Sequence, residues 1–196
     1  YPCMDSILER KVAIKAIQAG VEERRIVDEI RALLKLRSKH VVQVYDIIRL
    51  DDGSIGVVQE FIDGPDLFDE RTKSTSRDAL YRQLWQISSG IADIHDADTI
   101  HRDLKPNNMK VDPEGVIKIF DFGLARSNAG DASTMGFVGT RGFAAPELYG
   151  NDVKFTPAID VYAFGATALY LFSRTLPNEL MEQPPREIDA TTAARH

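Results

Sequence analysis

The hydrophobic pattern of this 196-residue chain changes at Asp63-Gly64-Pro65, where glycine and proline interrupt both strand and helix patterns. Before this break, three short runs rich in β-branched residues predict strands at residues 11–17, 41–50 and 54–62. Residues 22–36 carry apolar side chains every three or four positions, which predicts a helix. The first 62 residues are therefore expected to form a small strand-rich lobe with one helix.

After the break the pattern becomes helical. Residues 77–95 place apolar side chains on one helix face, and residues 159–172 are apolar nearly all round, which predicts a helix buried at the centre of a lobe. Two short apolar runs, 109–111 and 116–120, flank a turn and predict a hairpin, and residues 127–142 predict a long loop. Residues 63–196 are thus expected to form a larger helical lobe, and the fold class is α+β.

The amino-acid composition limits which binding partners and which cellular compartment we expect for this chain. The net charge of −6 is unfavourable for a nucleic-acid partner, because an acidic surface repels phosphates. The sequence contains no apolar run of about 18 residues, so no membrane span is expected in this chain. A single cysteine, Cys3, excludes an internal disulfide and fits a reducing compartment, so we predict a cytoplasmic location.

Several polar residues have the chemistry that phosphoryl transfer requires. Lys15 ends the first predicted strand and Glu29 lies on the inward side of the following helix, so an ion pair between them would aim the lysine at nucleotide phosphates. Asp103 is the candidate acid that orients the acceptor hydroxyl and accepts its proton, and Lys105 could neutralise the transferring phosphate.

Two further side chains offer oxygen ligands. Asn108 and Asp121 carry the hard oxygen donors that suit Mg²⁺, an ion that keeps several waters when bound. These two residues are therefore the predicted metal ligands.

Four motifs occur in one order along the chain: VAIK at 12–15, HRDLKPNN at 101–108, DFG at 121–123 and APE at 145–147. Together they resemble the signature set of eukaryotic-like (Hanks-type) Ser/Thr protein kinases, and the spacing of loop residues resembles bacterial members. The resemblance implies a bilobal protein-kinase-like fold, ATP and Mg²⁺ as cofactors, and transfer of phosphate to Ser or Thr of a protein substrate.

The resemblance also assigns the nucleotide site. It implies a hinge between the lobes at Glu60 to Ile62, Ala13 above the adenine, and Asp66 as the acidic ribose contact. Lys15, Glu29, Asn108 and Asp121 complete the implied ATP site. Beneath the adenine the family usually places an aliphatic residue, whereas this chain has Lys110.

The resemblance further implies a substrate platform and a regulated loop. Thr140 would bond Asp103 and Lys105, and the lysine in HRDLKPNN favours Ser/Thr over Tyr as acceptor. Arg102 and Arg126 would grip a phosphate on the activation loop. Residues implied as phosphorylation sites are Thr134 and Ser133, which predicts autophosphorylation.

The ends of the chain differ from the family pattern. Residues 1–10 contain no glycine, so the glycine-rich loop that covers the phosphates is expected before Tyr1. The chain also stops soon after the apolar segment 159–172. We therefore expect a catalytic domain that is truncated at both ends and is weakly active or inactive by itself.

Two other functions fit parts of this pattern. A pseudokinase or scaffold would bind nucleotide or partners without efficient transfer, but such proteins commonly lack one of the chemical residues that are all present here. A small-molecule phosphotransferase of the antibiotic-kinase type shares a related core, but the APE motif and the Gly139-Thr140 pair serve polypeptide docking.

Overall fold

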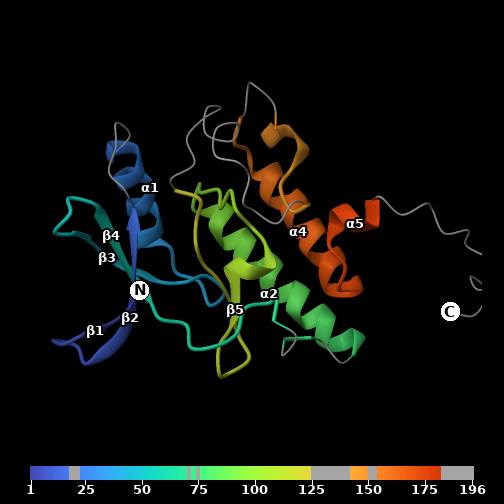
Figure 1. The fold of residues 1–196 in the computed structure, drawn as a ribbon, viewed down its shortest axis with the longest axis horizontal. Coiled ribbons are helices and arrows are strands. Elements are labelled where there is room, and N and C mark those ends of the chain that lie inside the picture. Colours follow the sequence, from blue (N-terminus) through green and yellow to red (C-terminus); the bar gives the residue numbers. More distant parts are fainter. Residues whose placement is uncertain (18–22, 70–71, 74–75, 125–141, 150–153, 182–196) are drawn as a thin grey trace, which may run out of the picture.

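The computed structural model describes residues 1–17, 23–69, 72–73, 76–124, 142–149 and 154–181. A strand-rich lobe with one helix lies beside a helical lobe, and the short hairpin that carries β5 lies between them (Figure 1). The predicted α+β class is confirmed.

A four-stranded antiparallel sheet forms the first lobe, in the order β1-β2-β4-β3. The strands are β1 (Pro2–Asp5), β2 (Arg10–Ile17), β3 (Val44–Arg49) and β4 (Ile55–Glu60). Helix α1 (Glu23–Lys35) contacts β3 and buries Ile26, Ile30 and Leu33, the apolar face that its periodicity predicted. The register pairs Lys15 with Val57 and Ala13 with Gln59, which sets the positions of the nucleotide-site candidates on β2.

The second lobe is built on helix α2 (Arg77–Asp96). Ser76 caps the N-terminus of this helix, because its hydroxyl accepts a hydrogen bond from the Ala79 N–H at 3.2 Å. Helix α4 (Pro157–Ser173) packs against α2, and the short helix α5 (Pro177–Met181) follows. The 3₁₀ turn η3 (Pro146–Tyr149) precedes α4.

Helix α4 is less buried than its sequence predicted. Ile159, Ala163 and Leu171 are buried, but Val161 and Phe172 are 59% and 55% exposed. The prediction of a helix buried all round is wrong for the described part of the chain, because only the face toward α2 and its neighbours is covered there.

A small hairpin joins the two lobes. The turn η2 (Pro106–Asn108) leads into β5 (Met109–Val111), which pairs with β6 (Ile117–Ile119). Ile119 donates to the His40 carbonyl at 2.9 Å and accepts from the Val42 N–H at 2.8 Å, while Leu67 donates to the Met109 carbonyl at 2.9 Å. One buried core cluster includes residues from both lobes and from this hairpin, so the hairpin fixes the loops at its ends relative to both.

Candidate active site

A buried carboxylate binds the backbone at the start of the loop from His101 to Asn108. Asp160 on α4 is 1% exposed and accepts hydrogen bonds from the backbone N–H groups of His101 at 2.8 Å and Arg102 at 3.0 Å. The ring of His95 lies 3.0 Å from the same carboxylate. Arg102 has a φ of 68°, a left-handed conformation that costs energy and persists where surrounding contacts hold it. Asp160 therefore fixes the start of the loop.

His101 connects this loop to the segment at Asp121. The Asp103 N–H donates to His101 Nδ1 at 3.2 Å, and His101 Nε2 lies 2.9 Å from the Phe120 carbonyl, so the neutral ring with its proton on Nε2 satisfies both contacts. Burial lowers the pKa of His101, although the charge of Asp160 opposes that shift. The Phe122 ring packs on this imidazole at 4.6 Å between centroids. A neutral histidine thus ties the two loops together.

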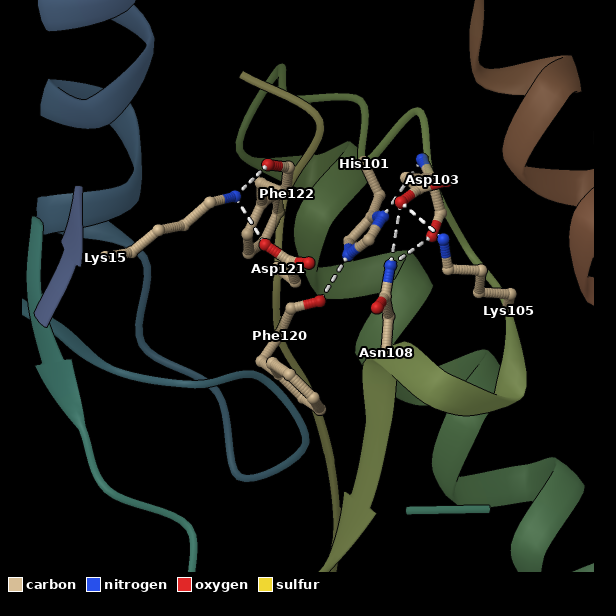
Figure 2. Close-up of polar contacts among 8 residues, drawn as sticks. All are labelled: Lys15, His101, Asp103, Lys105, Asn108, Phe120, Asp121 and Phe122. Atoms are coloured by element: carbon tan, nitrogen blue, oxygen red, sulfur yellow. Dashed lines mark hydrogen bonds and ion pairs between the residues drawn. The ribbon is translucent and has the colours of Figure 1, made fainter. Parts of the chain in front are cut away.

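Three predicted residues meet in one polar cluster. Asp103 Oδ2 accepts hydrogen bonds from Lys105 Nζ and from Asn108 Nδ2, both at 3.0 Å, and Asn108 Nδ2 also donates to the Asp103 carbonyl at 2.8 Å. Figure 2 shows the lysine and the amide converging on the aspartate from the turn that follows it. The cluster orients a carboxylate whose negative charge is balanced by an adjacent ammonium.

Lys15 does not form the ion pair that was predicted with Glu29. Its ammonium reaches across from β2 to the Asp121 carboxylate and donates to the Phe122 carbonyl at 3.0 Å (Figure 2). Glu29 instead accepts from Arg25 at 2.9 Å and from Arg102 at 3.0 and 3.1 Å. The predicted pairing is wrong because Glu29 is paired with Arg25 and Arg102, whose Nη1 contacts both Glu29 oxygens, while Lys15 is paired with Asp121.

The predicted phosphate-gripping residues are only partly described. The guanidinium of Arg102 pairs with Glu29 and lies 4.7 Å from the centroid of the Phe155 ring. The predicted phosphorylation sites and the other residues of the activation loop lie outside the described residues: Arg126, Ser133, Thr134 and Thr140.

The donor set around Asn108 and Asp121 fits Mg²⁺. Asn108 is buried and uses its amide N–H₂ on Asp103, which leaves its carbonyl oxygen as a ligand. Asp121 has a φ of 64° and places its carboxylate beside Lys15. Among the described residues, no group of three or more His, Cys, Asp or Glu is arranged to hold a metal. Mg²⁺ is often bound through one or two carboxylates plus substrate phosphates, so the few ligands present match that ion.

The connection between the lobes carries the remaining candidates. The Glu60 carboxylate pairs with Lys118 at 2.9 Å, and the Asp66 carboxylate accepts from the N–H groups of Phe68 at 2.9 Å and Asp69 at 3.1 Å. Ile62 is 7% exposed. Within the described part of the chain, the Ile62 N–H has no hydrogen-bond partner.

Sequence reasoning missed three partners of the site: Arg25, His95 and Lys118. The i,i+4 spacing of Arg25 and Glu29 on α1 was a signal that could have identified their ion pair. No local signal linked Lys118 to Glu60, because 58 residues separate the two.

No helix in the described part of the chain has the length and apolar character that crossing a membrane requires.

Curated proteins with similar sequences are protein kinases by name. The chain is 35% identical to Mitogen-activated protein kinase 5 of Arabidopsis thaliana over 181 residues, which cover 87% of this chain and 48% of that protein. It is 34% identical to human Cyclin-dependent kinase-like 2 over 178 residues, with coverage of 87% and 36%. For mouse Mitogen-activated protein kinase 12 the identity is 34% over 172 residues, with coverage of 83% and 46%.

The chain spans about half the length of the curated relatives it matches, or less. The sequence model described as "Protein kinase domain" matches residues 1–193. That match covers both lobes and every candidate residue of the site, so the chain belongs to the protein kinase domain family.

Proposed function

We propose that the protein containing this domain transfers the γ-phosphoryl group of ATP to Ser or Thr hydroxyls of protein substrates. The observation that carries the proposal is the cluster of Asp103, Lys105 and Asn108, in which both cationic and amide donors lie 3.0 Å from one carboxylate oxygen. The names of the relatives, mitogen-activated and cyclin-dependent-like kinases, support a protein as the substrate.

Asp103 is the proposed catalytic acid-base residue. Its carboxylate accepts the proton of the incoming hydroxyl and keeps that oxygen in line with the phosphate. Lys105 lies 3.0 Å from this carboxylate and is placed to balance negative charge that develops on the transferring group. The two roles need one loop with fixed geometry, which the Asp160 hydrogen bonds support.

Lys15 and the metal ligands form the proposed phosphate end of the site. Mg²⁺ held by Asn108 and Asp121 supplies counter-charge to the phosphates of ATP. The Lys15 ammonium, which is paired with Asp121, is the cationic side chain at the proposed phosphate end of the site. Ala13, Glu60, Ile62 and Asp66 remain the proposed contacts of the base and ribose, and the unpaired Ile62 N–H supports that placement because a base nitrogen would satisfy it.

Autophosphorylation of Thr134, with Ser133, is part of the proposal. A phosphate there would compete with Glu29 for Arg102, and Arg126 and Thr140 would complete the ordered loop. Mass spectrometry of the full-length protein after incubation with Mg-ATP tests this step. Complete absence of phosphate between residues 127 and 140 contradicts it.

The main test uses the full-length protein, radiolabelled ATP and a generic protein substrate. Asp103→Ala should reduce transfer by about 100-fold to 10,000-fold, the usual contribution of a positioned acid-base group. Asp96→Ala is the matched control, because Asp96 is an exposed carboxylate at the end of α2. Equal activity of Asp103→Ala and the wild type would refute the assigned role. Labelling of small molecules alone would instead indicate a small-molecule phosphotransferase.

One observation favours a second function, that of a pseudokinase or scaffold. Lys15 and Glu29 are each paired with other groups, so the phosphate-binding lysine is not held by the α1 carboxylate. Nucleotide binding by the full-length protein without transfer to any substrate would support this alternative.

A further inference from the structure

The hairpin β5–β6 places two lysines directly opposite each other. Lys110 on β5 pairs in register with Lys118 on β6, while Met109 and Ile119, on the other face of the hairpin, are fully buried. Both ammonium groups therefore extend toward the connection that begins at Glu60. Like charges at opposed positions are unfavourable unless each is balanced.

Only one of the two lysines is balanced by an acid. Lys118 Nζ lies 2.9 and 3.0 Å from the two Glu60 oxygens. Within the described part of the chain, Lys110 has no carboxylate partner. Its Nζ donates to the Ile62 carbonyl in a long contact of 3.4 Å and lies 5.9 Å from the centroid of the Phe120 ring. The Lys110 ammonium thus keeps donor capacity for another acceptor.

A second donor is available at the same residue that Lys110 contacts. Ile62 is 7% exposed, yet its backbone N–H has no partner among the described residues. Buried N–H groups are nearly always paired, so an unpaired one indicates an acceptor that the described part of the chain does not supply, such as a ligand atom. The Ile62 N–H and the Lys110 ammonium, which contacts the carbonyl of the same residue, together form a two-donor site.

We propose that Lys110 is a base-selecting residue, which allows this site to bind 6-oxopurine nucleotides such as GTP and ITP about as well as ATP. The inference rests on the proposed function, because it takes the base to lie against Ile62. A carbonyl oxygen carries two lone pairs and can accept from both donors at once. A ring nitrogen of adenine offers one lone pair, and the adjacent amino group is itself a donor.

A purely aromatic role for Lys110 makes a different prediction. An ammonium that only contacts the ring face would be attracted to any purine, because the attraction comes from the π system and not from an edge oxygen. Removal of the charge would then weaken ATP and GTP alike. The ratio of the two affinities separates the two roles.

The experiment measures dissociation constants of ATP, GTP and ITP with Mg²⁺ by titration calorimetry on the full-length protein. Lys110→Met keeps the alkyl stem and removes the ammonium, and should raise the ratio Kd(GTP)/Kd(ATP) by about tenfold, the size of one hydrogen bond to a charged group. Lys39→Met is the control, because Lys39 is an exposed lysine outside the proposed site, and it should leave that ratio unchanged. ITP should follow GTP, since its base shares the exocyclic carbonyl oxygen at C6 and lacks only the 2-amino group.

An unchanged ratio in Lys110→Met overturns the inference, as does an equal shift in Lys39→Met or an ITP response that follows ATP. In all these cases ATP still binds the wild type, so the proposed function survives. If no nucleotide binds the wild type, the proposed function and the inference both fail.

Discussion

Replacement of Asp160 should destabilise the domain strongly, because this carboxylate satisfies donors that no other described group reaches. Its two oxygens accept from the His101 N–H at 2.8 Å and the Arg102 N–H at 3.0 Å, and His95 lies 3.0 Å away. The residue is 1% exposed, so water cannot replace these bonds without rearrangement.

The size of the effect follows from the groups left unpaired. In Asp160→Ala, the buried His101 N–H and the partly buried Arg102 N–H lose their acceptor, at about 1–3 kcal/mol each. We therefore expect a loss of about 3–5 kcal/mol of unfolding free energy, a large part of the about 5–15 kcal/mol of a typical domain. Asp160→Asn keeps one oxygen acceptor and should lose less than the alanine variant.

Urea denaturation followed by circular dichroism measures these differences, with the full-length protein and matched temperature. A second measurement is phosphoryl-transfer activity under conditions where both variants remain folded. It should fall in both, because the Asp160 hydrogen bonds that fix the backbone next to Asp103 are lost or weakened. If Asp160→Ala lowers the free energy of unfolding by less than about 1 kcal/mol, the role assigned to the two hydrogen bonds is wrong, since two unpaired donors should cost more than that.

Three further predictions concern the lobe connection, the buried histidine and the metal ligands. Gly64→Ala should lower the melting temperature markedly, because a Cβ at this position would lie 1.8 Å from the Val111 carbonyl oxygen. Gly165→Ala on α4 is the control: a Cβ there meets nothing within 4 Å, so the variant should be neutral or stabilising by up to about 1 kcal/mol. The free energy of unfolding should rise with pH through the range just below about 6.5. Burial lowers the pKa of His101, so as the pH falls the unfolded chain binds this proton at a higher pH than the folded protein does. His101→Gln should flatten this pH dependence of unfolding free energy, and an equal slope in the variant would contradict the assignment to His101. Asn108→Ala should raise the Mg²⁺ concentration that half-activates transfer, and an unchanged titration would remove Asn108 from the metal site.

Much of the secondary structure was predictable because it depends on local patterns, although strand β1 was not predicted. Helices α1 and α2 begin and end within two residues of the predicted ranges, and β2 within one, since alternation and the helical repeat act over neighbouring residues. The cluster of Asp103, Lys105 and Asn108 was equally predictable. Its members lie within six positions of one tight loop, so their proximity follows from the chain itself.

The sequence by itself thus determined most of the longer elements, the order of the motifs and the polar cluster of Asp103, Lys105 and Asn108. Only the tertiary structure decided which partners Lys15 and Glu29 take, because Asp121 and Arg102 come from distant segments and compete through charge and geometry. The same holds for Lys110, whose contact with the Ile62 carbonyl joins residues 48 positions apart. Contacts between distant residues depend on how separate elements pack, and packing is a property of the whole fold.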